Sequence, residues 1–119
     1  MVGELSETER TICEAIWGRR LLRFVSKGSL RIAEPHDFGE IDGRRRLLFH
    51  QVGGESGSGR PFGWRWTEAG ELSGLQVLDR HFPGARPAPS GRHQRWDRLF
   101  ASVSRLTVVP GGALTDRDA

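Results

Sequence analysis

Three segments between residues 31 and 65 decide how this chain is expected to fold. They read Arg31-Ile32-Ala33-Glu34-Pro35-His36, Leu47-Leu48-Phe49-His50-Gln51-Val52 and Gly63-Trp64-Arg65, and a glycine- and serine-rich stretch over residues 53–63 connects the second to the third. Apolar runs bounded by turn-forming residues are typical of short strands. Because basic and amide side chains lie on these strands, the sequence predicts a small β-structure with a polar, anion-binding site.

A helix is predicted before these strands. Ser6-Glu7-Thr8-Glu9 is a capping box, in which Ser6 caps the helix and Glu9 reaches back to the cap amide. Apolar residues then recur at helical spacing as far as Trp17. We therefore expect a helix over residues 7–18.

Five strands are expected after this helix. Lys27-Gly28 marks a tight turn between the first two strands. Pro35 is expected to end the ladder pairing of the second strand, because proline has no N–H to donate. Residues 37–43 are predicted to form a loop, in which Asp42-Gly43 marks a second turn. The five strands are placed over residues 21–25, 30–34, 46–52, 64–67 and 74–80.

A second helix is predicted near the end of the chain. Residues 83–91 are rich in proline and cannot hold a helix. Apolar residues then recur at three- and four-residue steps, which predicts an amphipathic helix over residues 92–104. The small, polar residues 110–119 are expected to be a frayed tail. The apolar residues of this second helix are Trp96, Leu99, Phe100 and Val103.

Together these elements predict one α+β domain spanning residues 1–119. Short connections imply antiparallel pairing, since a parallel crossover needs about a dozen residues or more. Closing the sheet removes its edges. A small five-stranded antiparallel β-barrel is therefore expected over residues 20–82, between the N-terminal helix and the C-terminal helix.

The charge of the chain is unevenly distributed. Residues 1–18 hold four glutamates and one arginine, whereas residues 19–65 hold ten basic residues and five acidic ones. Of the 18 basic residues, 17 are arginine. Arginine suits anion recognition because its planar fork matches phosphate, and a GC-rich genome explains the excess equally well.

The sequence also bears on where the protein works. Residues 1–9 lack the basic start and the apolar stretch of a signal peptide, and no apolar run approaches the about 20 residues of a membrane helix. A cytoplasmic location without membrane contact is therefore expected. The single cysteine, Cys13, excludes an internal disulfide, and its apolar helical setting predicts a buried hydrophobe rather than a reactive thiol.

No group of residues suggests a metal, a cofactor or catalysis. The four histidines lack the spacing of a metal site. Ser56 lacks the flanking glycines and the following helix of a nucleophile elbow. The loop over residues 54–60 lacks the Lys and Ser/Thr of a Walker loop. We expect a non-enzymatic protein, in which the loop is either a flexible tip or a source of backbone N–H groups for an anion.

Cations and aromatic rings lie close together in the middle of the chain. Arg31 and Arg65 are expected on strands, and Trp64 lies beside Arg65. Cations contact phosphate and ring faces stack on bases, so this combination favours nucleic-acid or nucleotide binding. A solvated turn explains residues 44–46, all arginine, better than a binding role does, and the tryptophans would also suit a core.

Several short motifs, in their order and spacing, resemble those of the WYL domain family over residues 10–82. The family's Trp-Tyr pair is replaced by Arg45-Arg46, and an arginine of the family pattern is replaced by Glu71. The segments that carry the resemblance are Ala15-Ile16-Trp17-Gly18-Arg19-Arg20, Arg31-Ile32-Ala33-Glu34-Pro35, residues 45–50, residues 63–72 and Ser73-Gly74-Leu75.

The resemblance implies an Sm-like or SH3-like barrel that senses a single-stranded nucleic acid or a (cyclic) nucleotide in transcription regulation or phage defence. Most WYL proteins that regulate transcription carry an N-terminal winged helix, and none is expected here because few residues precede the helix predicted over residues 7–18. Regulation through the barrel itself or through a partner is therefore expected. The ligand is expected in one groove lined by Arg31, His50, Gln51, Trp64 and Arg65.

A protein-interaction subunit is the alternative. A partner protein or a second copy of the chain would then dock on the barrel edge or on the C-terminal helix. This alternative predicts an exposed apolar patch near Trp96 and Phe100.

Overall fold

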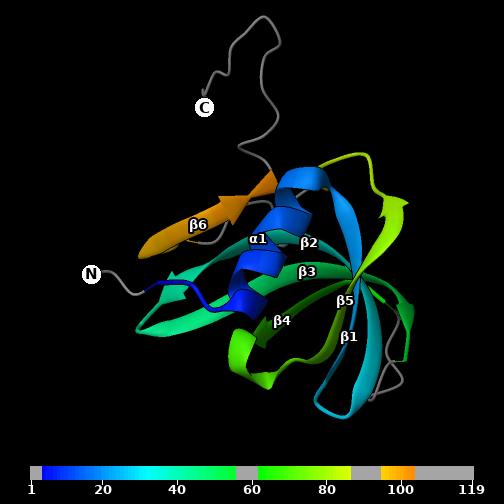
Figure 1. Cartoon of the computed structure of the whole chain (residues 1–119), viewed down its shortest axis with the longest axis horizontal. Helices are drawn as coiled ribbons and strands as arrows, with labels where there is room; N and C mark the ends of the chain where they lie inside the picture. Colours follow the sequence, from blue (N-terminus) through cyan, green and yellow to red (C-terminus); the bar gives the residue numbers. More distant parts are fainter. Residues whose placement is uncertain (1–3, 56–61, 87–94, 104–119) are drawn as a thin grey trace, which may run out of the picture.

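The computed structural model describes residues 4–55, 62–86 and 95–103, which form one helix, a short 3₁₀ turn and a six-stranded antiparallel sheet (Figure 1). The expected α+β class is confirmed. The middle of the glycine-rich loop, the connector over residues 87–91, the start of the predicted second helix and the tail lie outside the described residues. The elements are α1 (Glu7–Gly18), β1 (Arg20–Ser26), β2 (Ser29–Ile41), β3 (Arg44–Gly54), β4 (Trp64–Glu68), η1 (Ala69–Glu71), β5 (Ser73–His81) and β6 (Arg98–Ser102).

Helix α1 begins and ends where the sequence predicts. The hydroxyl of Ser6 accepts the N–H of Glu9 at 3.1 Å, and the Glu9 carboxylate accepts the N–H of Ser6 at 2.8 Å. The capping box is therefore complete. Arg19 ends the helix in the left-handed conformation with φ 54°, and its N–H donates to the carbonyls of Ala15 and Ile16.

The sheet has the strand order β4-β3-β2-β1-β5, and β6 pairs with the second half of β2. The predicted closed five-stranded barrel is wrong, because within the described residues β4 and β5 do not pair and a sixth strand is present. The sheet nevertheless curls. Ser26 of β1 and Thr67 of β4 belong to strands that do not pair, yet their hydroxyls share a hydrogen bond of 3.0 Å.

Strand β2 continues past Pro35, where the sequence predicted the end of its pairing. Its ladder with β3 shifts register between Pro35 and Asp37, and such a bulge accommodates a residue without an N–H. On the other edge, pairing with β1 ends at Ala33 and pairing with β6 begins at Asp37. The predicted loop over residues 37–43 is therefore strand as far as Ile41, followed by the tight turn at residues 42–43.

Strand β6 replaces the C-terminal helix predicted over residues 92–104, so that prediction is wrong in the part that the structure describes. A short apolar run fits both helical and strand spacing. The open edge of β2 decides between them, because Leu99 pairs with Gly39 in an antiparallel ladder. Pairing with a distant strand thus overrides the local helical pattern.

Helix α1 covers one face of the curled sheet, which we call the core face (Figure 1). The rings of Phe24 and Phe49 meet there edge to face, with centroids 5.2 Å apart.

Cys13 is buried as predicted, and burial, with the charges of Glu9 and Glu14, raises the pKa of its thiol to about 11. No helix among the described residues has the length and apolar character needed to cross a membrane. The hydrophobic core between α1 and the core face, in which Cys13 lies, also includes Ile12, Ala15, Ile16, Leu22, Ala33, Phe38 and Leu47.

Gly39 offers a test of where β6 lies. A methyl group at Gly39 would collide with the ring of Trp96 and the backbone carbonyl of Arg98. We predict that Gly39→Ala lowers the free energy of unfolding by about 1–3 kcal/mol, the usual cost of overpacking. Urea denaturation followed by circular dichroism measures this.

The matched control is Gly70→Ala, because nothing lies within 4 Å of a methyl group added there. It should change the free energy of unfolding by less than about 0.5 kcal/mol. Equal stabilities of the two variants would contradict the pairing of β6 with β2.

Candidate functional site

Strand alternation places the five predicted site residues on two opposite faces of the sheet. Cross-strand partners share a face, and successive residues of a strand point to opposite faces. Arg65 pairs with the core residue Phe49, whereas Trp64 pairs with His50. The structure therefore does not bring the five residues into one groove. The core face carries Arg31, Gln51 and Arg65, and the opposite, outer face carries His50 and Trp64.

Arg31 and Gln51 form a buried hydrogen-bond network. Nη1 of Arg31 donates to Oε1 of Gln51 at 2.9 Å, and Nε and Nη2 each lie 3.4 Å from the carbonyl oxygen of Ser26. Nε2 of Gln51 donates to the carbonyls of Gly53 and Glu55 at 2.8 and 2.7 Å. Both amide hydrogens of Gln51 are thus used within the protein. We assign the pair to fixing the end of β3 against β2.

Arg31 and Arg65 lie near each other but differ in exposure. Arg31 is 8% exposed, whereas Arg65 is half-buried. Burial lowers the pKa of Arg31, and the charge of Arg65 lowers it further. An anion would have to displace existing hydrogen bonds to reach the Arg31 guanidinium.

The outer face of β3 and β4 carries aromatic rings and a guanidinium. His50 and Trp64 meet edge to face, with ring centroids 5.2 Å apart. The guanidinium carbon of Arg46 lies 5.4 Å from the ring centroid of Trp66. All four side chains are half-buried, and Phe62, which precedes β4, is exposed. We call Arg46, His50, Trp64 and Trp66 the aromatic face.

Three polar nitrogens at or beside the aromatic face have no hydrogen-bond partner within the described residues. Nδ1 of His50, Nε of Arg46 and Nε1 of Trp96 are buried and make no hydrogen bond within the described part of the chain. The ring of Trp96 lies beside this face, 5.7 Å from that of Trp66. Buried polar atoms without a partner are uncommon and costly. Leaving these three nitrogens without a partner within the described residues therefore costs the folded chain free energy.

Glu34, His36 and Arg86 form a cluster beside the aromatic face. Nε and Nη2 of Arg86 donate to the two carboxylate oxygens of Glu34, at 2.6 and 3.1 Å. Nε2 of His36 accepts the N–H of Arg86 at 3.1 Å, so Nδ1 carries the proton and donates to the Glu34 carbonyl at 2.9 Å. The His36 ring meets Trp64 edge to face, with centroids 4.7 Å apart. Sequence reasoning missed this cluster, because Arg86 lies in the connector that follows β5.

Burial and hydrogen bonding shift the pKa values of the His36 ring and the Arg86 guanidinium in opposite directions. Burial lowers the pKa of His36, which favours the neutral ring. The hydrogen bonds that Arg86 donates to the Glu34 carboxylate raise the pKa of Arg86, which keeps the guanidinium charged. The pKa of His50 is lowered in the same direction as that of His36, by burial and by the charge of Arg86.

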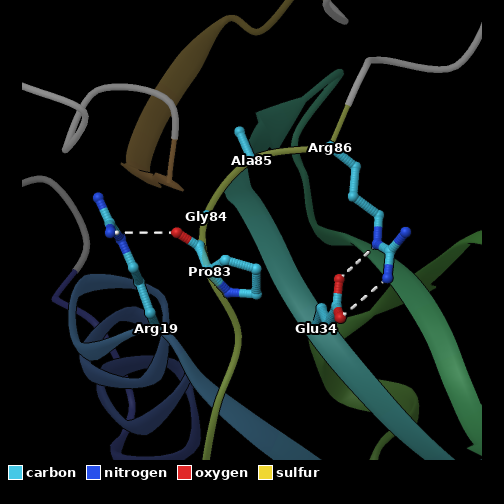
Figure 2. A pocket seen from close by; sticks show the side chains of 6 residues that line it. All are labelled: Arg19, Glu34, Pro83, Gly84, Ala85 and Arg86. Atoms are coloured by element: carbon cyan, nitrogen blue, oxygen red, sulfur yellow. Dashed lines mark hydrogen bonds and ion pairs between the residues drawn. The ribbon is translucent and has the colours of Figure 1, made fainter.

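An open pocket of about 530 Å³ lies between the end of α1 and this cluster (Figure 2). Arg19 stands on one side and donates from Nη1 to the carbonyl of Pro83 at 3.3 Å. Arg86, paired with Glu34, stands on the other side. Residues 83–85 run between the two arginines.

The glycine-rich stretch over residues 53–63 is described at its two ends, as far as Glu55 and again from Phe62. The N–H of Glu55 donates to the carbonyl of Leu30 at 2.7 Å, and its carboxylate accepts the N–H of Leu30 at 2.9 Å. These two bonds fix the start of the loop to β2, whereas the predicted contact with an anion falls on residues outside the described ones. In the described ranges, no three His, Cys, Asp or Glu side chains are grouped to hold a metal ion.

Trp96 and Phe100, which the protein-interaction alternative expects in an exposed apolar patch, are both half-buried. Phe100 packs against Phe38 with ring centroids 5.8 Å apart, and Trp96 packs against Trp66. The two rings therefore offer little apolar area to a partner. In the part of the chain that is described, the exposed large apolar side chains are Trp17, Val25, Phe62 and Val77.

Comparison with known proteins gives no identification, because no family model, no curated protein and no solved structure matches this chain. The resemblance to WYL domains therefore stays a prediction. The function has to be argued from the site itself.

The histidines should make the stability depend on pH. Burial lowers the pKa of His36 and His50, so the unfolded chain binds protons that the folded chain does not. Their contribution is complete above the unfolded pKa of about 6.5 and is lost as the pH falls below it. We predict that the free energy of unfolding decreases between about pH 7.5 and 5.5, by at most about 1.4 kcal/mol per pH unit for each histidine.

His36→Gln removes one titrating group and keeps a side chain that hydrogen-bonds. Its unfolding free energy, measured by urea denaturation, should vary less with pH than that of the wild type. His81→Gln, at an exposed position of β5, is the control and should keep the wild-type dependence. A His36→Gln profile as steep as that of the wild type would refute the assignment.

The buried network should be needed for folding. Gln51→Leu leaves Nη1 of Arg31 and two backbone carbonyls without their partners, and losing the partner of a buried charge costs about 3–5 kcal/mol. We predict a loss of that size in chemical denaturation. Gln76→Leu changes an exposed glutamine of β5 and should cost less than about 0.5 kcal/mol. A mild effect of Gln51→Leu would mean that Arg31 does not depend on this amide.

Proposed function

We propose that this chain binds single-stranded nucleic acid through the aromatic face, as a non-catalytic module. One observation carries the proposal: His50, Trp64 and Trp66 lie on one face of two adjacent strands, with the Arg46 guanidinium over the Trp66 ring. Bases stack on aromatic rings and arginines contact the phosphates, which is how sheet surfaces hold single strands.

Arg46 is the cation best suited to a phosphate on this face. Its neighbours are engaged, since Arg44 pairs with Glu68 at 3.3 Å and Arg45 with Glu9 at 2.8 Å. Arg46 makes no ion pair among the described residues. Its contact with Trp66 leaves the guanidinium able to meet a phosphate without first breaking a salt bridge.

Two features of the sequence support the same class of ligand. The basic excess of the chain falls in residues 19–65, which include all of β1, β2 and β3. The motifs that resemble WYL domains imply a nucleic acid or nucleotide, sensed in transcription regulation or phage defence. A free nucleotide would use the same rings as a strand.

The proposed site keeps part of the groove predicted from the sequence. His50 and Trp64 remain in it, whereas Arg31 and Gln51 are assigned to the internal network. Arg46 and Trp66 are added, because strand register places them on the same face as His50 and Trp64.

The test is the affinity for a fluorescently labelled, unstructured strand of about twelve nucleotides, measured by anisotropy over a range of salt concentrations. Trp66→Leu removes a stacking surface and should weaken binding about tenfold or more. Arg46→Gln removes one phosphate contact, so the slope of log K against log salt should become shallower by about 0.7.

Trp17→Leu and Arg23→Gln are the matched controls. Trp17 is exposed on α1, on the other side of the sheet, and Arg23 is exposed on β1. Both should bind as the wild type does. No binding by the wild type at low salt, or equal losses in the controls and the site variants, would refute the proposal.

A further inference from the structure

The pocket between Arg19 and Arg86 is lined by groups that can bind an anion (Figure 2). The side chain of Arg19 forms one hydrogen bond, to the carbonyl of Pro83 at 3.3 Å, and no ion pair within the described residues. Its other guanidinium N–H groups are available to a ligand. Nη1 of Arg86 takes no part in the two hydrogen bonds to Glu34.

The backbone between the two arginines adds neutral donors. The N–H groups of Gly84 and Ala85 make no hydrogen bond in the part of the chain that is described. Gly84 has a φ of 147°, and only the Arg19 guanidinium would come within 4 Å of a methyl group placed on it. The absence of a side chain at Gly84 therefore keeps the space beside that guanidinium open.

Two groups limit how strongly this pocket attracts an anion. The Glu34 carboxylate lies in its lining, although both of its oxygens already accept from Arg86. The end of α1 carries partial negative charge, which the Arg19 side chain offsets. A free anion should therefore bind weakly, and a second contact of the same ligand elsewhere would be needed for useful affinity.

That second contact is close by. Arg86 donates its backbone N–H to His36, and the His36 ring meets Trp64 of the aromatic face with centroids 4.7 Å apart. A base stacked at Trp64 and a phosphate in the pocket are thus separated by one histidine ring. The pocket is a recess beside the sheet. Such a recess suits the phosphate at the end of a nucleic-acid strand better than a phosphate in the middle of that strand.

We infer that the Arg19–Arg86 pocket binds a phosphate monoester, either the terminal phosphate of a single strand or that of a free nucleotide. The inference rests on the proposed function, because the aromatic face supplies the second contact. A dianionic terminal phosphate gains more from two guanidinium groups than a singly charged internal phosphate does.

The experiment compares labelled strands of one sequence that carry a 5′-phosphate, a 3′-phosphate or neither, at one salt concentration. A nucleoside monophosphate, used as an unlabelled ligand in calorimetry, distinguishes the free nucleotide from the strand. At least one phosphorylated strand should bind the wild type about tenfold more tightly than the unphosphorylated strand. Arg19→Gln should lose that preference.

Arg10→Gln is the matched control. Arg10 also donates one hydrogen bond from Nη1 to a backbone carbonyl, that of Leu5 at 2.8 Å, and its loss removes the same charge. Arg10 lies nine residues before Arg19, about 14 Å away along α1 at 1.5 Å per residue. This variant should keep the preference for a phosphorylated strand.

The outcomes separate the two proposals. Equal binding of all three strands by the wild type would overturn the proposed phosphate site in the pocket. It would not contradict the proposal that the aromatic face binds a nucleic-acid strand. Binding of the monophosphate that depends on Arg19, without binding of any strand, would support the pocket and reject the strand proposal. Loss of the preference in Arg10→Gln as well as in Arg19→Gln would reduce it to general charge attraction and overturn the pocket. Failure of every ligand to bind would overturn both.

Discussion

The structure depends on one long strand, β2, which pairs along one edge with β3 and on the other edge with β1 and then β6. The change of partner from β1 to β6 leaves a short stretch of that edge of β2 without a neighbouring strand, and Pro35 lies in this stretch. The bulge between Pro35 and Asp37 lets the ladder with β3 continue despite the missing N–H. Arg86 crosses the same stretch and bonds to both Glu34 and His36.

Side-chain alternation along the β2–β3–β4 ladder then determines what each polar residue can do. On the core face, Arg31 and Gln51 are buried and satisfy each other, so they contribute to folding. On the outer face, Trp66 and His50 stay partly exposed, and Nδ1 of His50 and Nε of Arg46 find no hydrogen-bond partner among the residues that the structure describes. A shift of one residue in the register would exchange these two sets of side chains.

Local signals in the sequence predicted the parts of the fold that depend on neighbouring residues. The capping box at Ser6 and the turns at residues 27–28 and 42–43 are of this kind. Pairing between distant strands has no such signal, which is why β6 was predicted as a helix and Pro35 as the end of a strand. For the site, Arg31 and His50 were both recognised as polar strand residues. Which face each occupies depends on the bulges, which the sequence alone does not reveal.

The indole N–H resonances of the four tryptophans test most directly whether the ligand binds on the outer face of β3 and β4, as proposed. Trp64 and Trp66 lie on the aromatic face, whereas Trp17 is 52% exposed on α1, on the other side of the sheet. In a two-dimensional ¹H–¹⁵N NMR titration with an unstructured DNA strand, the resonances of Trp64 and Trp66 should shift and that of Trp17 should not. A shift of Trp17 alone, or unchanged resonances of Trp64 and Trp66 at saturating strand, would contradict the account.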